Sequence, residues 1–371
     1  MSGTAQHQRR RMPAEWEPQR ALWTAWPADP ELWGADLAHA QADFIGLVEA
    51  LSSNVGLNPA NIEILVSRAP GVLEEVTRRI ESKRVIFHLA DYGDIWLRDT
   101  GPTFLLDDSN RLGSLRFSFN GWGGRYLFDA DRSVGAVVED AARVPPETRF
   151  TSRLVCEGGA IESDGAGTLL TTRACVLNAN RNPGLSQADA DAAFRAALGV
   201  RAVVWLDDGL ANDHTDGHVD TIARFVGPGR VACHVPLDKH DPNAATMNGI
   251  AEALKVARDA SGRRFEVVEI PSPGSVCTKD GTLMPASHLN FVLSNGVMIV
   301  PLYDTDRDAL AVDAFAAACP QYRVVGASAR GILSGGGAFH CITQQEPGVT
   351  NTDADADADA DAEIENGGSR G

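Results

Sequence analysis

Four short β-rich runs recur at nearly even intervals along the chain, each shortly after a glycine. The glycines are Gly101, Gly167, Gly229 and Gly296, which lie 66, 62 and 67 residues apart. The region 13–347 is long enough for five such intervals. Units at one period with weak sequence identity favour radial repetition, in which every unit sends a loop toward a common axis. The alternative is ordinary α/β alternation with accidental spacing.

Helical and strand patterns alternate along these intervals. Apolar residues at helical spacing predict helices, the third of them capped by Ser186, over 36–52, 70–82, 187–198, 243–259 and 307–318. Runs rich in β-branched and apolar residues predict strands over 62–66, 103–106, 168–171, 230–233 and 297–300. Together the two patterns predict an α/β fold of about five ββαβ-like units.

The chain contains no Pro/Gly linker that would divide its body, so we expect a single domain over residues 12–347. Residues 1–11 are polar, and we expect them to be disordered. The tail 348–371 contains an Asp-Ala alternation, with seven acidic residues against one arginine. Such a like-charged, low-complexity segment cannot bury a core, so we expect a disordered, solvated tail.

Charge and cysteine usage limit the partners of this chain. Its net charge is −17, and the body stays acidic when the tail is set aside. An acidic surface disfavours nucleic acid and mildly favours a cationic ligand. No run of about 20 apolar residues predicts a membrane span, and no secretory signal begins the sequence. The six cysteines are scattered without a CxxC pair, so we expect reduced thiols and a cytoplasmic location.

Cys341 is the first candidate for chemistry. A lone cysteine is usually a small core residue, but this one closes the segment Gly335-Gly336-Gly337-Ala338-Phe339-His340-Cys341. Three glycines allow unusual dihedral angles and a close approach of the backbone. A catalytic cysteine reacts as the thiolate, which nearby positive charge favours. A cationic ligand can help to supply that charge.

The segment His218-Val219-Asp220 is the second candidate. In a strand, His218 and Asp220 would lie on one face and point into one site. His218 would serve as general acid and base, and Asp220 would accept two N–H groups of a planar cation. A metal site with His214 and Asp216 is the alternative. Gly217 disfavours the helix that such a pair of histidines needs, so we expect no metal.

Three further segments contain residues suited to a cationic substrate. Trp96 can stack on a guanidinium and Asp99 can pair with it, although a buried Trp and a salt bridge from Arg98 are the structural alternative. Glu157, before paired glycines, either contacts the far end of the substrate or a neighbouring loop, or belongs to a plain turn. The segment 120–124 is glycine-rich with one Trp, and either lines or covers a pocket or forms a tight turn.

Taken together, these segments resemble the agmatine deiminase family, in the group that also holds bacterial-type peptidylarginine deiminases. The match covers about residues 12–347 and rests on several motifs in order: Met12-Pro13-Ala14-Glu15-Trp16-Glu17-Pro18, Trp23-Thr24-Ala25-Trp26-Pro27, Trp96 to Pro102, Phe119 to Gly124, Glu157-Gly158-Gly159, Leu169 to Thr172, Asn180-Arg181-Asn182-Pro183, Asp216 to Asp220, and Gly335 to Gln345. The resemblance implies a five-bladed pseudo-symmetric α/β propeller, the pentein fold of guanidino-group-modifying enzymes. It also implies catalysis without a metal or cofactor.

The resemblance assigns roles to residues at the matching positions. Cys341 would be the nucleophile, His218 the acid and base, and Asp99 and Asp220 the carboxylates that hold the guanidinium. The residues implied to bind substrate are Trp96, Glu157, Asp216 and Asn290. The implied reaction converts agmatine to N-carbamoylputrescine and ammonia through a thiouronium on Cys341, a step of polyamine biosynthesis.

Other functions remain open at this point. The same residues would serve a deiminase of peptide arginine or of another guanidino compound. A non-catalytic binding protein for cationic metabolites and a metal-dependent hydrolase are further alternatives. The family forms oligomers, so a homo-oligomer is expected. The chain departs from the usual family pattern at Ala338-Phe339, at His288 and at Thr221.

Overall fold

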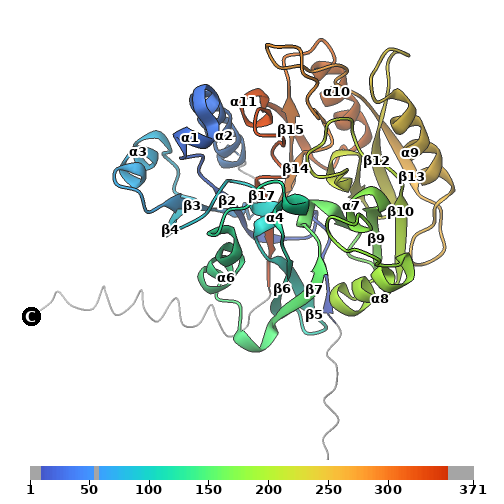
Figure 1. Cartoon of the computed structure of the whole chain (residues 1–371), viewed down its shortest axis with the longest axis horizontal. Helices are drawn as coiled ribbons and strands as arrows, with labels where there is room; N and C mark the ends of the chain where they lie inside the picture. Colours follow the sequence, from blue (N-terminus) through green and yellow to red (C-terminus); the bar gives the residue numbers. More distant parts are fainter. Residues whose placement is uncertain (1–9, 54–57, 350–371) are drawn as a thin grey trace, which may run out of the picture.

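The computed structural model of the chain describes residues 10–53 and 58–349, whose strands form five small sheets. Each sheet contains one unit of the same order: two antiparallel strands, then a helix, then a third strand parallel to the second. The sheets surround a common centre, and the long helices lie at the periphery (Figure 1). The predicted five-bladed α/β propeller of ββαβ-like units is therefore confirmed.

Four units follow one another along the chain. The first is β5 (Thr103–Asp107), β6 (Leu112–Ser118), α6 (Asp131–Ala141) and β7 (Arg149–Val155). The second is β8 (Ile161–Ser163), β9 (Thr168–Thr172), α8 (Gln187–Leu198) and β10 (Ala202–Leu206). The third is β11 (Ala223–Gly227), β12 (Arg230–Val235), α9 (Ala244–Val256) and β13 (Glu266–Pro271). The fourth is β14 (Val292–Ser294), β15 (Val297–Leu302), α10 (Asp308–Ala318) and β16 (Arg323–Ser328).

The fifth unit joins segments from the two ends of the described chain. Its elements are β17 (Thr343–Pro347), β2 (Gln19–Ala25), α2 (Leu37–Ser52) and β3 (Asn61–Ser67), extended by α3 (Val72–Arg79) and β4 (Val85–Ala90). β17 pairs antiparallel with β2, with Gln344 opposite Trp23. The Trp23 indole also donates to Glu346 over 2.7 Å. The last strand is therefore required to complete the sheet that the first long strand begins.

The predicted ends of the domain need one correction. We expected residues 1–11 to be disordered, but Arg10 and Arg11 form a short strand, β1, antiparallel to β5. The Arg10 guanidinium also donates to the carbonyl of Ala197 over 3.1 Å. Backbone pairing and this contact order Arg10 and Arg11, which their polar surroundings in the sequence had led us to expect in a disordered segment. Residues 1–9 and 350–371 lie outside the described ranges.

Local sequence explains where the predicted helices begin and end. The Ser186 hydroxyl accepts from the backbone N–H of Asp189 at the start of α8, and Gly199 ends the helix in the left-handed region at φ 70°. The face toward the core contains Phe194 and Leu198. The predicted helices all form within the predicted ranges, and no helix in the described ranges is long and apolar enough to cross a bilayer.

The glycines behind the spacing argument are not all equivalent. Gly167, Gly229 and Gly296 lie between the first and second strands of their units, at φ values of 101°, 71° and 89°. These positive angles suit a residue without Cβ. Gly101 instead follows α4 (Leu97–Thr100) at φ −77°, before the first strand of its unit. In that unit the hairpin turn uses Asn110, at φ 56°.

The segment before the first strand of each unit lies at the common axis. These segments are α4, η3 (Gly158–Ala160), η4 (Val219–Thr221), the residues around Asn290, and the residues around Cys341. His218 and Asp220 thus belong to a 3₁₀ turn, and the expected strand was wrong. Both side chains are nevertheless buried together, because a tight turn at the axis leaves them no solvent-facing side. The propeller therefore places one short segment of every unit at the axis.

Candidate active site

A cavity of about 270 Å³ opens at this axis. Aromatic rings and carboxylates make up much of its lining, which comprises Leu32, Trp33, Asp36, Asp94, Trp96, Asp99, Trp122, Tyr126, Phe128, His214, Thr215, Ser334, Gly335, Gly336, Gly337 and Cys341. The lining extends from half-exposed Asp36 to Cys341 and Asp99, which are only 7% and 8% exposed. Within the described ranges, no lysine or arginine lines it. The cavity is therefore suited to a cation with an apolar stem.

Cys341 is held at this cavity by hydrogen bonds to its own backbone. The Asn290 side-chain oxygen accepts from the backbone N–H groups of His340 and Cys341, over 3.1 and 3.2 Å. The Cys341 carbonyl accepts from the N–H of Arg98 over 3.1 Å. A Cβ at Gly337 would come within 3.1 Å of the sulfur and 2.6 Å of the Trp96 ring, so this position needs glycine. Asn290 therefore positions the thiol.

Burial raises the pKa of the Cys341 thiol well above its usual value, and the carboxylates of Asp220 and Asp99 add to the rise. Hydrogen bonds from the Ala338 backbone and the Asn290 side chain act in the opposite direction without overcoming it. Burial and the two carboxylates therefore both disfavour the thiolate. A cation held between the two carboxylates would favour the thiolate.

Three of the predicted groups converge on Gly159. A Cβ there would lie 2.4 Å from His218 Nδ1, 3.1 Å from Asp220 Oδ2 and 3.1 Å from Asp99 Oδ1. Asp220 Oδ2 is also 3.7 Å from the Cys341 sulfur. The absent side chain at Gly159 thus lets an acid, a base and the thiol surround one small volume.

Asp99 is fixed by two donors. Trp122 Nε1 donates to Asp99 Oδ2 over 2.8 Å, and the Gly159 N–H donates to Oδ1 over 2.9 Å. Trp122 has a φ of 52° and a ψ of 53°, an unusual conformation for a bulky residue. The glycine-rich segment 120–124 therefore supplies a cavity wall that orients a carboxylate, an outcome among those that the sequence allowed.

Asp220 is paired with a histidine that sequence reasoning did not assign. His340 Nδ1 lies 2.8 Å from Asp220 Oδ2, while Asp220 Oδ1 is buried without a hydrogen-bond partner. Burial opposes the charge on Asp220, but the His340 contact outweighs it and lowers the pKa of the carboxyl. His340 Nε2 lies 3.3 Å from Glu15 on the other side. In the sequence, the position of His340 next to Cys341 could have indicated that it belongs to the site.

His218 contacts carboxylates with both ring nitrogens. Nδ1 is 3.9 Å from Asp99 Oδ1, and Nε2 is 3.5 Å from Glu157 Oε2. Burial disfavours the imidazolium, but Asp99, Cys175 and Glu157 together outweigh it and hold the pKa of His218 well above its usual value. His218 itself is not among the described residues that line the cavity, and it contacts the cavity residue Asp99 through Nδ1.

Glu157 lies behind His218 and is not among the described residues that line the cavity. Arg181 Nε donates to both carboxylate oxygens of Glu157 over 2.9 Å, and Glu157 is fully buried. The sequence prediction that Glu157 binds substrate is therefore revised. Its carboxylate is held by Arg181 and contacts His218, whose charged form it stabilises.

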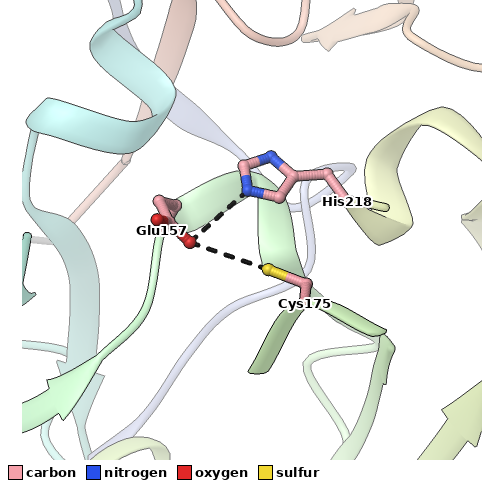
Figure 2. A group of neighbouring side chains, drawn as sticks. All are labelled: Glu157, Cys175 and His218. Carbon is pink, nitrogen blue, oxygen red and sulfur yellow. Dashed lines mark hydrogen bonds and ion pairs between the residues drawn. The ribbon is translucent and has the colours of Figure 1, made fainter. Parts of the chain in front are cut away.

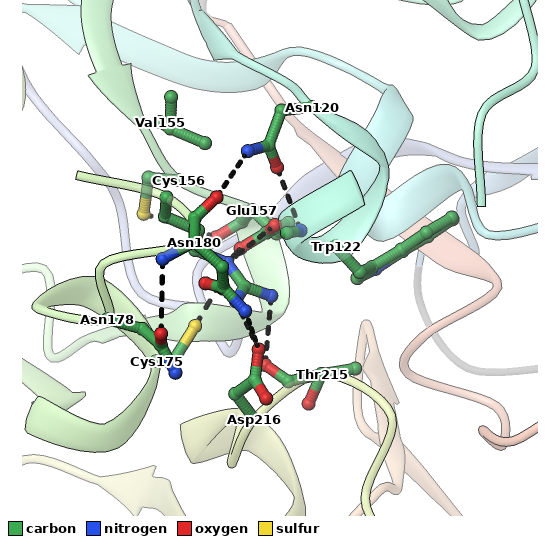
Figure 3. A network of polar contacts seen from close by, with 12 residues as sticks. Asn120, Trp122, Val155, Cys156, Glu157, Cys175, Asn178, Asn180, Thr215 and Asp216 are labelled. Carbon is green, nitrogen blue, oxygen red and sulfur yellow. Dashed lines mark hydrogen bonds and ion pairs between the residues drawn. The ribbon is translucent and has the colours of Figure 1, made fainter. Parts of the chain in front are cut away.

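Asp216 is also displaced from its predicted role. It accepts from Arg125 over 2.6 Å, from Arg181 over 2.6 Å and from Asn180 over 2.8 Å. Figure 3 shows the Asn180 part of this network: Asn180 contacts Asp216, and Asn120 donates to the carbonyl of Asn180. Burial raises the pKa of Asp216, but these donors outweigh burial and lower it overall. Asp216 thus ties together three loops behind the cavity wall.

Trp96 does reach the cavity, together with two residues that the sequence did not single out as binding groups. Trp33 and Trp96 stack with ring centroids 6.1 Å apart. Their indole N–H groups both donate to Asp94, over 3.1 and 2.6 Å. Burial raises the pKa of Asp94 to about 6. Asp94 therefore orients the aromatic wall, and its adjacency to Trp96 in the sequence was the available signal.

The departures from the family pattern lie outside this wall. Neither His288, Ala338 nor Thr221 is among the described residues that line the cavity. His288 Nε2 lies 3.0 Å from Asp308, and its other nitrogen faces the carbonyl of Pro271 at 3.1 Å. These substitutions therefore change packing behind the site and leave its lining unaltered.

The structure does not bring together the histidines and aspartates of the metal site that the sequence offered as an alternative. His214 lines the cavity and contacts the Tyr126 hydroxyl over 2.9 Å, whereas His218 faces Glu157. Two other groups among the described residues bring three potential metal ligands together: Glu157, Cys175 and His218, and Glu15, Glu162 and His340. His214, Asp216 and Asp220 belong to neither group.

Known proteins are similar to this chain in sequence and in fold. A family model described as Porphyromonas-type peptidyl-arginine deiminase matches residues 11–347. Agmatine deiminases of Pseudomonas aeruginosa and Pseudomonas putida are each 36% identical, covering 91% of this chain and 95% of the relative. The solved agmatine deiminase of Enterococcus faecalis superposes with a TM-score of 0.84 at 30% identity, covering 91% of this chain and 96% of that one. A C. jejuni agmatine deiminase with substrate bound gives 0.83 at 25% identity, covering 95% and 100%.

Proposed function

The chain belongs to the Porphyromonas-type peptidyl-arginine deiminase family, and from this premise we propose that it hydrolyses agmatine to N-carbamoylputrescine and ammonia. The observation that carries the proposal is that His218, Asp99 and Asp220 meet at Gly159, while Asp220 also contacts the thiol of Cys341. Asp99 and Cys341 line the acidic, aromatic cavity. The reaction supplies a precursor of putrescine and so serves polyamine biosynthesis.

The first half of the reaction forms a covalent intermediate. Asp99 and Asp220 hold the planar guanidinium, and its positive charge promotes release of the Cys341 thiol proton to solvent. The thiolate attacks the central guanidinium carbon and forms a neutral tetrahedral adduct. His218, already protonated, gives its proton to one nitrogen, the carbon–nitrogen bond breaks, and ammonia leaves. A cationic thiouronium remains on Cys341.

The second half regenerates the enzyme. Neutral His218 removes a proton from water, which attacks the thiouronium carbon. The second adduct expels the Cys341 sulfur, and its hydroxyl proton passes to that sulfur, which restores the thiol and leaves the substituted urea, N-carbamoylputrescine. His218 ends the cycle protonated, as it began, and the departed ammonia takes up the proton that Cys341 released. No metal or cofactor takes part in any step.

The cavity supports agmatine over free arginine because of the charges around it. Agmatine has an ammonium group at its far end, whereas arginine also has a carboxylate there. Asp36 lies half-exposed on the lining, and among the described residues its only ion-pair contact is His39 at 3.9 Å. A carboxylate opposite this group would be repelled and would meet no lysine or arginine among the described lining residues. We therefore assign Asp36 to the ammonium of agmatine.

The test measures ammonia release from agmatine, arginine and an arginine peptide side by side, with wild type and Cys341→Ala. Release that depends on Cys341 and is fastest with agmatine is the expected result. Faster release from the peptide or from another guanidine would keep the mechanism and replace the substrate. Agmatine binding without ammonia release would favour the non-catalytic binding protein, and activity lost in chelator would favour a metal-dependent hydrolase.

The remaining predictions are part of the same proposal. The catalytic unit covers residues 12–347, works in the cytoplasm and forms a homo-oligomer. The six unpaired thiols suit a reducing compartment. Light scattering of the purified chain measures its mass in solution, and a monomeric mass would refute the oligomer. A chain without residues 350–371 should retain full activity.

A further inference from the structure

Three metal-binding side chains meet behind His218, on the side away from the cavity. We call Glu157, Cys175 and His218 the rear cluster (Figure 2). Glu157 Oε2 is 3.5 Å from His218 Nε2 and 3.7 Å from the Cys175 sulfur. All three donor atoms lie within 4.8 Å of one another, and the residues are 0–1% exposed. The cluster is a compact set of nitrogen, sulfur and oxygen ligands.

The spacing of this set matches one metal ion. Tetrahedral Zn²⁺ with ordinary bond lengths separates a nitrogen from an oxygen ligand by about 3.4 Å, and a sulfur from an oxygen ligand by about 3.6 Å. The corresponding separations here are 3.5 and 3.7 Å. An imidazole, a thiolate and one carboxylate are also the ligand types that zinc prefers over magnesium or calcium. Little movement would therefore be needed to form three of its bonds.

The contact of His218 with Glu157 is wide enough to admit a ligand. His218 Nε2 is buried, and its ion pair with Glu157 measures 3.5 Å, longer than an ordinary hydrogen bond. In Figure 2 a dashed line joins this nitrogen to Glu157, and a second joins Glu157 to Cys175. A metal ion would replace these two long contacts with three shorter bonds.

The charges around the rear cluster can accommodate the ion. Glu157 already balances the charge of Arg181 and can keep that contact, because each carboxylate oxygen has two lone pairs. The charge of Zn²⁺ would be balanced by the release of two protons, one from the Cys175 thiol and one from the His218 imidazolium.

We propose that the rear cluster is an inhibitory zinc site, with Cys175, His218 and Glu157 as protein ligands and a fourth position for water. The inhibitory part rests on the proposed function. With zinc on Nε2 the ring is no longer an imidazolium, so His218, whose Nδ1 faces Asp99, cannot give the proton that releases ammonia. The metal would thus stop the first half of the reaction without touching Cys341.

Binding is tested without turnover, using Co²⁺ as the spectroscopic probe. A thiolate ligand gives a near-ultraviolet charge-transfer band with Co²⁺. We expect this band in wild type and Cys341→Ala, and its loss in Cys175→Ala. Cys156→Ala is the matched control, because Cys156 is another buried thiol beside Glu157, with its sulfur 3.5 Å from the Glu157 carbonyl. Absence of the band in wild type, or its loss in Cys341→Ala instead, would overturn the site.

Inhibition is tested by titrating Zn²⁺ into the agmatine assay. Half-inhibition of Cys175→Ala should need at least tenfold more Zn²⁺ than half-inhibition of wild type, and chelator should restore wild-type activity. Equal sensitivity of the two proteins would refute the inhibitory role. If alanine lowers the melting temperature, Cys175→Ser keeps the side-chain size and replaces it in both tests. An inactive enzyme that still gives the cobalt band would refute the proposed function and leave the site intact.

Discussion

Two cysteines lie on opposite sides of His218, and their surroundings differ in one decisive way. Burial and neighbouring carboxylates raise the pKa of both Cys341 and Cys175, the latter to about 11 beside Glu157. Cys341 lines the cavity, whereas Cys175, in α7 (Arg173–Val176), is fully enclosed. Neither thiol is intrinsically acidic. We infer from this difference that a thiol in this protein becomes reactive only where a cationic substrate can reach its sulfur, as it can at Cys341 and not at Cys175.

The largest expected effect comes from exchanging each thiol for a hydroxyl. Cys341→Ser should lower kcat by at least about 10⁴-fold, because it removes the attacking sulfur. Cys175→Ser should lower kcat by about tenfold or less, because it alters only the surroundings of His218. Steady-state kinetics with agmatine measures both. Comparable losses in the two variants would show that the thiols are not functionally distinct.

Glu157→Gln tests the rear of His218 itself. The change removes the charge that supports the imidazolium and leaves Arg181 without its buried partner, so kcat should fall by about 100-fold. KM for agmatine should change less than about twofold, since Glu157 does not line the cavity. A large rise in KM with unchanged kcat would restore the substrate-binding role predicted from the sequence.

The pH dependence of alkylation separates the thiols by access. Because the pKa of Cys341 is raised, its reaction with iodoacetamide in the free enzyme should increase about 100-fold between about pH 7 and about pH 9, without a plateau. Cys175 should remain unmodified in the native protein. Peptide mass spectrometry measures both sites. A plateau near neutral pH would mean that the free enzyme already holds a Cys341 thiolate.

Trp122→Phe tests the support of Asp99 on the cavity side. Loss of the indole N–H removes the donor to Asp99 Oδ2, and kcat/KM should fall by about tenfold. Phe119→Leu is a useful control, because Phe119 packs edge-on against Trp122 but donates no hydrogen bond. Equal losses in both variants would assign the effect to packing.

Asp36→Asn should give the smallest effect. One half-exposed ion pair contributes about 1 kcal/mol, so KM for agmatine should rise about fivefold with kcat nearly unchanged. Butylguanidine, which has no ammonium group, should show no change in KM. A similar rise for both compounds would remove Asp36 from amine recognition.

Periodicity and motif order were enough to predict much of the molecule. The helical ranges and the five units follow from apolar spacing and turn glycines, although Gly101 entered that argument from a different place in its unit. Cys341, Asp99 and Trp96 reach the cavity as expected, because the segments before first strands meet at the axis. The sequence indicated which segments meet, but it did not indicate which side chains line the cavity and which lie behind its wall.

The position of a side chain behind the cavity wall explains why two substrate-binding predictions needed revision. Glu157 and Asp216 were taken for substrate ligands because carboxylates suit a cation. Their actual partners, Arg181 and Arg125, come from other loops, and no spacing rule connects them. His340 and Cys175 were overlooked for the same reason: only the folded chain shows that they contact Asp220 and Glu157.

The pairing of β17 with β2 has a consequence for biosynthesis. Cys341 directly precedes β17, so a nascent chain still lacking its last strand has neither a closed ring nor a fixed nucleophile. The sheet begun by β2 must wait for the rest of the chain to be translated. Hydrolytic activity therefore arises only at the final step of ring closure, and a ribosome that stalls before β17 releases a polypeptide that cannot act on its substrate.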